Sequence, residues 1–265
     1  MPRSTSASDV PGGDQADIQA VSRVSQILAL FDPGTPELSA SEVAERLGLN
    51  RTTAYRYCTS LVSAGLLERS VDQGRYIPGS LLLQLGAFAI GRRRVVNLAP
   101  AYLQALSRNT QMTAVLCLWG TTGPVVTRVE EDTSNIVVVS VRVGSHLPLE
   151  SAQSQVFVAF HHDQLAMERL LATMPLADRE RLRKQIDEVR RTAHCSASST
   201  PGVVAVAAPV FDEYGTCATI AVVGTDNDLS MSDDAPELRK VMDTARALTK
   251  EMGGIFPVDE AEADA

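Results

Sequence analysis

The stretch from residue 38 to 79 limits the fold of this chain more than any other part of its sequence. Ser39 and Glu42 stand three residues apart before an apolar run, a spacing that is typical of a capping box at the start of a helix. Gly48 can end that helix, and Asn50 is a good N-cap for a second helix just after it. The stretch therefore predicts two short helices joined by a tight turn, which is the arrangement of a helix-turn-helix.

Segments on both sides of this helix pair complete a small module. Upstream, apolar residues recur at spacings of three and four, which predicts an amphipathic helix that ends at Pro33-Gly34. Those apolar residues are Ile18, Val21, Val24, Ile27, Leu28 and Phe31. Downstream, two β-rich triplets, 67–69 and 75–77, flank the turn Asp72-Gln73-Gly74 and predict a hairpin. Three helices and a hairpin over residues 18–79 make a winged helix-turn-helix.

The second domain, residues 110–254, mixes β-rich runs with helical ones, and two linker helices over 80–109 lead into it. Short turns at 120–123 and 212–215 join consecutive strands, so the sheet should be antiparallel and the fold class α+β. The predicted strands are 112–119, 124–131, 136–143, 203–211 and 216–224, and the predicted helices are 151–160, 163–173, 176–192 and 233–254.

Charge is distributed unevenly along the chain. Residues 18–94 carry nine Arg against six acidic residues, a net charge of +3. Residues 95–265 carry fourteen basic against twenty-three acidic residues, a net charge of −9. A basic module can therefore bind nucleic acid inside a chain whose net charge is −8. The polar ends, 1–17 and the acidic 255–265, lack the apolar content to repay ordering and are expected to be disordered tails.

The second helix of a helix-turn-helix places its first turns against base edges in the major groove of DNA. With Asn50 as the N-cap, the outward positions of those turns are Arg51, Thr52, Thr53, Tyr55 and Arg56. Arg can donate two hydrogen bonds to guanine, and Thr can contact a thymine methyl group or a phosphate. Arg75 on the wing is expected to contact a phosphate. Ser39 and Ser41 at the start of the supporting helix could do the same, although helix capping alone would also account for them.

At these residues the sequence resembles the IclR family of bacterial transcriptional regulators, from about Gln19 to Gly254. The matching pieces, in this order, are AVSRVSQILALF, LSASEVAERLGL, RTTAYR, GRYIPG and PGVVAVAAPVFDEYG. The resemblance implies a GAF-like C-terminal domain that binds a small-molecule effector. It also implies a dimer or tetramer that binds a palindromic, double-stranded DNA operator and acts as a repressor or an activator.

A symmetric dimer is expected on physical grounds as well. One three-helix module offers too few contacts for high specificity, and two modules related by a two-fold axis can bind two half-sites. The apolar linker face also needs a partner for burial, and it comprises Leu82, Leu83, Leu85 and Phe88.

The resemblance also implies where an effector would bind. In the family, backbone N–H groups at the start of the helix that follows the third strand receive a carboxylate. Ala152 and Gln153 hold those positions in this chain, at the N-terminus of the predicted helix 151–160.

The chain departs from the family pattern around this position. Ser154-Gln155 replaces a common Gly-Lys pair, Cys195 stands where an Asp can be a ligand, and Ala221 and Val223 stand where some members have Ser. These changes remove hydrogen-bonding groups from the pocket, so Cys195, Ala205, Ala221 and Val223 are expected to form apolar walls. The effector should then be an acid with an aromatic or aliphatic body rather than pyruvate or glyoxylate. The alternative is that Ala and Val on these strands are plain core.

Several other classes of protein are disfavoured. The longest apolar segment, 81–91, is shorter than the roughly 20 residues of a membrane-spanning helix. The first residues lack the pattern of a secretory signal, so a cytoplasmic location and no membrane partner are expected. The four cysteines are far apart and form no C-x-x-C, which predicts reduced thiols and no metal or cofactor. They are Cys58, Cys117, Cys195 and Cys217.

Three alternative functions stay open at this point. An enzyme could use a histidine, but the chain has no H-E-x-x-H, G-x-S-x-G or P-loop motif, and no catalysis is expected. A redox or metal sensor could use Cys58 or Cys195, provided that the thiol lies in an electropositive, partly open setting. A protein-interaction module could keep this fold without binding DNA. The histidines that the first alternative would draw on are His146, His161, His162 and His194.

Overall fold

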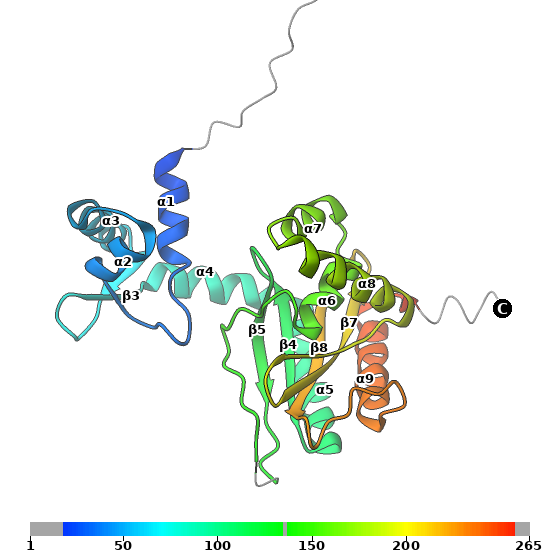
Figure 1. The fold of residues 1–265 in the computed structure, drawn as a ribbon. Coiled ribbons are helices and arrows are strands. Elements are labelled where there is room, and N and C mark those ends of the chain that lie inside the picture. The colour runs from blue at the N-terminus through cyan, green and yellow to red at the C-terminus, as the bar shows by residue number, and fades with distance from the viewer. Residues whose placement is uncertain (1–17, 135–136, 258–265) are drawn as a thin grey trace, which may run out of the picture. The chain divides into compact units, whose positions relative to one another are not determined.

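A computed structural model of the chain describes residues 18–134 and 137–257, so both predicted tails lie largely outside the described residues. The chain divides into two compact units, one through Leu83 and one from Gln84. Figure 1 shows a small, mainly helical unit (blue to cyan) and a larger unit in which helices cover a sheet (green to orange). In the described ranges no helix combines the length and the apolar character needed to cross a membrane.

The N-terminal unit is the predicted winged helix-turn-helix. Its helices are α1 (Gln19–Leu28), α2 (Ala40–Leu47) and α3 (Arg51–Ser63), and its strands are β1 (Leu38–Ser39), β2 (Leu67–Arg69) and β3 (Arg75–Pro78). The strands form an antiparallel sheet of order β1-β3-β2. Strand β1 was not predicted, because two residues are too short to show an alternating pattern. It pairs Leu38 with Tyr76 and Ser39 with Arg75, which fastens the wing to the start of α2.

The predicted caps of α2 and α3 are confirmed, whereas α1 ends at Leu28, before the Pro33-Gly34 stop that the sequence indicated. The Glu42 N–H donates to Ser39 Oγ at 3.2 Å and the Ser39 N–H donates to Glu42 Oε2 at 2.7 Å, so the capping box is complete. Gly48 ends α2 in the left-handed conformation at φ 63°, which costs glycine no Cβ clash. The Thr53 N–H donates to Asn50 Oδ1 at 2.7 Å, which caps α3.

The buried core of this unit differs from the prediction at one end of α1. Ile27 is fully buried, but Ile18 and Val21 are 68% and 63% exposed. The spacing of apolar residues continues to the start of the helix, yet α1 contacts the module mainly through its C-terminal half. Val43, Ala44, Ala54, Cys58 and Leu61 lie inward as expected, and the core also includes Leu38, Leu67 and Tyr76 from the three strands.

A substitution in the capping box has a measurable cost. Replacing Ser39 by Ala leaves the Glu42 N–H without its acceptor and should destabilise the start of α2 by about 1 kcal/mol. We expect the amides of α2 to exchange with deuterium roughly five times faster, as measured by mass spectrometry of peptides from this helix. The matched control is Ser41→Ala, which removes an exposed hydroxyl from the same turn. Equal exchange rates in the two variants would contradict the capping role.

The C-terminal unit has the predicted α+β architecture. Its helices are α5 (Arg94–Thr110), α6 (Ala152–Phe160), α7 (Gln164–Leu171), α8 (Leu176–Thr192) and α9 (Pro236–Met252), and α4 (Ser80–Gly91) precedes them. Its strands are β4 (Thr113–Trp119), β5 (Pro124–Glu130), β6 (Cys195–Thr200), β7 (Val203–Asp212) and β8 (Gly215–Thr225). They form an antiparallel sheet of order β5-β4-β8-β7-β6.

Alternation along the strands divides this unit into two layers of core. Side chains such as Leu116, Val206 and Ile220 face α5 and α9 in one cluster. Their strand neighbours Ala207 and Ala221 face α6, α7 and α8 on the other side of the sheet. Both faces are therefore covered, which explains the nearly continuous apolar runs of β7 and β8.

The strand predicted at 136–143 is not a strand; residue 136 itself lies outside the described residues. The following residues keep the alternation of an extended chain, with Val139 and Val141 half-buried against the sheet. Thr113 Oγ1 donates to the Val139 carbonyl at 2.5 Å. The valines pack onto the face of the sheet instead of pairing along its edge, and sequence alternation cannot distinguish these two placements.

Strand β6 lies where the sequence predicted a loop. It pairs with β7 as an edge strand, with Cys195 opposite Ala207 and Ala197 opposite Ala205. Its composition is rich in Ser and Ala and it ends at Pro201-Gly202, which is why the sequence resembled a loop. Polar residues are tolerated because an edge strand keeps part of its surface in water.

Candidate DNA interface and effector cavity

The outward face of α3 presents the residues that the sequence assigned to DNA. Arg51, Thr52, Tyr55 and Arg56 are exposed and Thr53 is half-buried, whereas Ala54 and Cys58 on the opposite side are fully buried. The Asn50 side chain caps the first turn of α3 through the Thr53 N–H, and the uncapped backbone N–H groups of a helix N-terminus generally favour anions. This face carries two guanidinium groups and two threonine hydroxyls.

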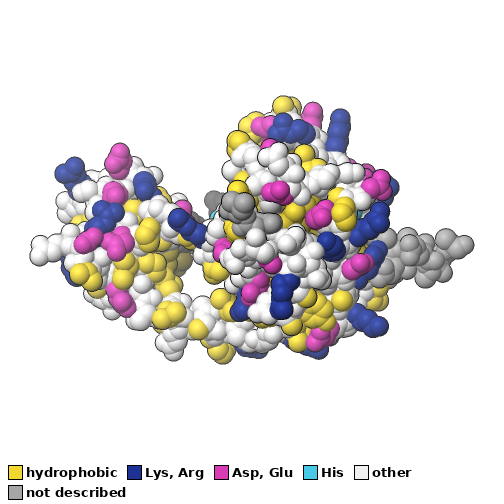
Figure 2. Space-filling view, turned by 90° about the horizontal axis from the view of Figure 1, so that it is seen from below, with side chains coloured by type: hydrophobic (Ala, Val, Ile, Leu, Met, Phe, Trp, Pro, Cys, Tyr) yellow, Lys and Arg dark blue, Asp and Glu magenta, His cyan; other side chains and the backbone are white. Residues whose placement is uncertain are grey.

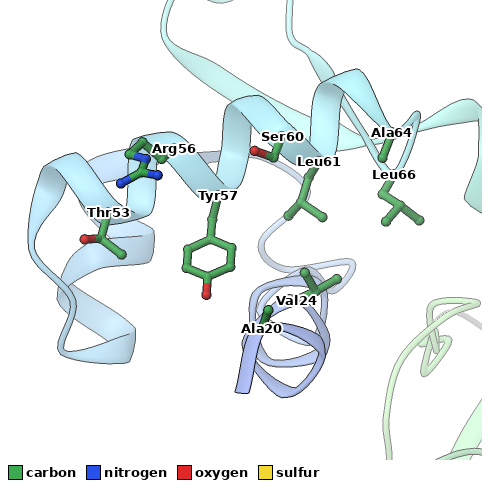
Figure 3. Close-up of a pocket in the computed structure, with 9 residues that line it drawn as sticks. All are labelled: Ala20, Val24, Thr53, Arg56, Tyr57, Ser60, Leu61, Ala64 and Leu66. Carbon is green, nitrogen blue, oxygen red and sulfur yellow. The ribbon is translucent and has the colours of Figure 1, made fainter. Parts of the chain in front are cut away.

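The flank of α3 borders a groove of about 530 Å³ against α1. Figure 3 shows Tyr57 pointing from α3 towards Ala20 and Val24 of α1, with Thr53 and Arg56 nearer the N-terminal end of α3. Tyr57 thus separates the polar face of α3 from the apolar flank.

Of the three residues on the wing and at the start of α2 for which a phosphate contact was considered, Arg75 differs from the expectation. Arg75 Nη2 donates to the Glu37 carbonyl at 3.0 Å and to Glu42 Oε1 at 3.3 Å. The guanidinium group is therefore engaged within the domain, which disfavours the expected phosphate contact. Ser39 is engaged in the capping box, as the alternative for that residue had it, while Ser41 is exposed.

The surface of the C-terminal unit carries basic side chains mostly beside acidic ones. On α8, Arg181 pairs with Asp178 at 2.9 Å, Arg190 pairs with Asp187 at 2.8 Å, and Arg191 pairs with Glu188. Figure 2 shows the same intermixing of blue and magenta side chains over this unit. Local pairing leaves little excess positive charge there, which is consistent with DNA binding by the N-terminal unit alone.

A cavity of about 460 Å³ lies on the face of the sheet that α6 covers. Its floor comes from β4, β6, β7 and β8, its end wall from the start of α6, and its roof from the irregular residues 139–148, which we call the roof segment. The lining residues are Val115, Val139, Ser140, Val141, Arg142, Ser145, His146, Leu147, Pro148, Ser151, Ala152, Gln153, Ala197, Ser199, Thr200, Val203, Ala205 and Val223.

Four of the seven predicted effector residues line this cavity, and they are Ala152, Gln153, Ala205 and Val223. The other three lie in the core beside it. Ser154 is fully buried, with its hydroxyl donating to the Pro148 carbonyl at 2.7 Å. Cys195 and Ala221 lie one strand repeat further along the same sheet face, where α6 and α8 already cover them. For Cys195 the wall position is instead taken by Ala197.

Sequence reasoning missed the roof segment of the cavity. Val139, Val141 and Leu147 supply its apolar surface, while Arg142 and His146 add polar groups. The alternating valines were the available signal, but they were assigned to a strand.

The start of α6 offers hydrogen-bond donors to the cavity. Ser151 Oγ accepts from the Ser154 N–H at 3.3 Å, and the Ser151 carbonyl accepts from the Gln155 N–H at 3.1 Å. Within the described residues, the N–H groups of Ala152 and Gln153 have no acceptor, as is usual for the first turn of a helix. The Gln153 side chain is held by Thr219, with Nε2 3.3 Å from Oγ1. The arrangement can receive a carboxylate at one end and an apolar body beyond it.

The cysteines are unsuited to a redox role. Burial raises the pKa of Cys195 to about 12, and it raises the pKa of Cys217 to about 12 as well. Burial also raises the pKa values of the Cys58 and Cys117 thiols. A reactive thiol needs the opposite shift, so the structure disfavours the redox alternative.

The four histidines do not form a metal-binding group in the described residues. The rings of His161 and His162 stack at 4.5 Å, and the pKa of His194 is lowered by burial. Across residues 18–134 and 137–257, no three His, Cys, Asp or Glu side chains are grouped so that they could hold a metal ion.

The raised thiol pKa values predict slow alkylation of the native protein. At neutral pH the four thiols should be almost entirely protonated, and we expect iodoacetamide to modify them about tenfold or more slowly than in guanidinium chloride. Mass spectrometry of the alkylated protein measures the number of labels over time. Rapid labelling of native Cys195 would revive the redox alternative.

Two family models match the chain. The IclR helix-turn-helix domain matches residues 20–70, and the bacterial transcriptional regulator IclR C-terminal domain matches residues 87–250. The regulator XynR of Escherichia coli K12 is 28% identical over 230 residues, which cover 82% of this chain and 89% of XynR.

Solved structures share the fold. A putative IclR regulator from Silicibacter has a TM-score of 0.78 at 22% identity and covers 90% of this chain and 98% of its own. An IclR homologue from Microbacterium hydrocarbonoxydans, solved in complex with 4-hydroxybenzoate, has a TM-score of 0.67 at 20% identity and covers 88% of this chain and 98% of its own. Because both domain models match in order along the sequence, this chain belongs to the IclR family of bacterial transcriptional regulators.

Proposed function

We propose that this protein binds a palindromic DNA operator as a homo-oligomer in the cytoplasm, and that a small apolar acid in the cavity modulates its affinity for DNA. The observation that carries the proposal is the capped N-terminus of α3. Its outward turns bear Arg51, Thr52, Tyr55 and Arg56, while the inward residues are buried. No catalytic step is part of this function.

At the operator, the first two turns of α3 enter the major groove. Arg51 and Arg56 are the side chains long enough to donate two hydrogen bonds to guanine, and Thr52 and Thr53 contact thymine methyl groups or phosphates. Tyr55, which is 52% exposed, lies on the same outward face. Exposed Ser41 is the serine available to a phosphate at the start of α2.

A second copy of the chain supplies the second half-site. Several large apolar side chains are exposed on α1 and α4, and water would disfavour them in a lone monomer. They are Ile18, Val21, Leu83, Leu85, Phe88 and Ile90. Their exposure supports a dimer in which a second copy covers them, and the same surfaces are compatible with a tetramer.

The cavity supports an effector with an aromatic or aliphatic body. Ten of its eighteen lining residues are apolar, and the two N–H groups at the start of α6 provide the anion site. Its volume of about 460 Å³ exceeds the needs of pyruvate or glyoxylate. The Microbacterium homologue was solved with 4-hydroxybenzoate, an acid of this chemical kind.

Replacing Arg51 by Ala tests the DNA-contacting face. We expect the variant to lose about 1–3 kcal/mol of specific affinity, because a bidentate contact to a base is lost. The measurement is a footprint and a binding titration on DNA from upstream of the protein's own gene. Arg169→Ala, which removes an exposed charge from α7, serves as the control and should bind normally. Full operator affinity in the Arg51 variant would contradict the assignment.

Replacing Ala205 by Phe tests the cavity. In the unaltered protein, a saturating aromatic acid at about 100 times its Kd should stabilise the fold by about 2.7 kcal/mol, seen as a rise in Tm. The phenyl ring should fill the cavity floor and abolish that rise. Ala247→Phe, on the exposed surface of α9, is the matched control and should retain it. Stabilisation by pyruvate or glyoxylate alone would reject the apolar-effector proposal.

A further inference from the structure

The two arginines of the wing occupy different environments. Arg75 begins β3 and is half-buried, whereas Arg69 ends β2 and is exposed. Both carry the same charge, so the sequence alone gives no reason to assign them different roles. The contacts of their guanidinium groups give such a reason.

The Arg75 guanidinium group bridges three acceptors within its own domain. Nη2 lies 3.0 Å from the Glu37 carbonyl and 3.3 Å from Glu42 Oε1, and Nε lies 3.7 Å from Glu37 Oε2. The side chains of this trio are between 32% and 38% exposed, so water screens them only in part. These bonds link the wing strand to the residue before β1 and to the first turn of α2.

Glu42 serves two partners at once. Oε2 accepts from the Ser39 N–H in the capping box, and Oε1 accepts from Arg75. Hydrogen bonds from Ser39, with a smaller contribution from the charge of Arg75, hold the pKa of Glu42 below its usual value. The carboxylate is thus ionised at neutral pH and connects the wing to the supporting helix of the helix-turn-helix.

The same strand then supports Arg69. Tyr76, the neighbour of Arg75, pairs with Arg69 across the hairpin and is only 2% exposed. The guanidinium carbon of Arg69 lies over the Tyr76 ring, 5.7 Å from its centre. A cation that stacks on a fixed aromatic ring keeps its outer N–H groups available to a phosphate.

We propose that Arg75 is a positioning residue that braces the wing against Glu42, and that Arg69 is the residue of the wing that binds a DNA phosphate. This inference rests on the proposed DNA binding. It reverses the expectation that Arg75 itself contacts the phosphate.

The salt dependence of DNA binding by the full-length protein tests the proposal. Each phosphate contact contributes about 0.9 to the slope of log affinity against log salt. Fluorescence anisotropy with a labelled mixed-sequence duplex, over a series of salt concentrations, measures this slope. We expect Arg69→Ala to reduce the magnitude of this slope by about one. In the Arg69→Ala background, Arg75→Ala should cause no further decrease, because the brace acts through Arg69. A further decrease of about one in the magnitude of the slope would show that Arg75 binds its own phosphate, and it would overturn the proposal.

Glu42→Gln supplies a second test, because the proposal predicts the direction in which DNA affinity changes. Gln is accepted at this position of a capping box, so the variant keeps the cap and loses the ion pair with Arg75. We expect it to weaken DNA binding about two- to fivefold, the range of a partly exposed ion pair, and to add nothing to Arg75→Ala. Removing one negative charge would otherwise strengthen DNA binding, and that result would count against the brace.

Two controls separate the possible failures. Thermal unfolding shows whether each variant is folded. If Arg75→Ala does not fold, Glu42→Gln still tests whether Arg75 braces the wing. Arg51→Ala reports on the recognition helix. If the unaltered protein shows no salt-dependent binding to the duplex, the proposed function and this inference both fall. If the unaltered protein binds and the Arg69 and Arg75 variants keep its slope, this inference alone falls.

Discussion

The carboxylate of Glu42 holds together the part of the molecule that would meet DNA. One oxygen completes the cap of α2 through Ser39, and the other receives the guanidinium group of Arg75 from the wing. Helix α2 in turn packs against α3, so the orientation of the recognition helix and that of the wing share one anchor. Glu42 thus has a structural role within a basic module, although its negative charge opposes the net positive charge that DNA binding favours.

Local chemistry made most of the N-terminal unit predictable. The capping box, Gly48 and Asn50 each act within a few residues of the chain, so their spacing was sufficient to place α2 and α3. The role of Arg75 could not be found in this way, because its partners Glu37 and Glu42 lie more than thirty residues away in sequence. Long-range pairing also explains why the two-residue strand β1 was missed.

The C-terminal unit shows the limit of alternation as a signal. The apolar runs of β7 and β8 were found because both faces of the sheet are covered. Val139 and Val141 have the same alternation, but they pack on the sheet instead of joining it. Cys195 and Ala197 lie on the same face of β6, and only the strand register shows that Ala197 rather than Cys195 lines the cavity. The wall residues were therefore predicted in part, and the roof segment was not.

The length of the floor strands of the cavity is more constrained than the length of its roof segment. The floor strands β4, β7 and β8 each have a hydrogen-bonded neighbour on both sides, so adding a residue to one of them would shift side chains to the opposite face. In the described part of the chain, the backbone of the roof segment bonds to β5 at Pro124 and Val126, its Val139 carbonyl accepts from Thr113 Oγ1, and its Pro148 carbonyl accepts from residues at the start of α6. It can lengthen or shorten without disturbing the sheet. Evolution would therefore find new ligand preferences most readily by insertion and deletion in this one loop, while the antiparallel sheet beneath it stays constant.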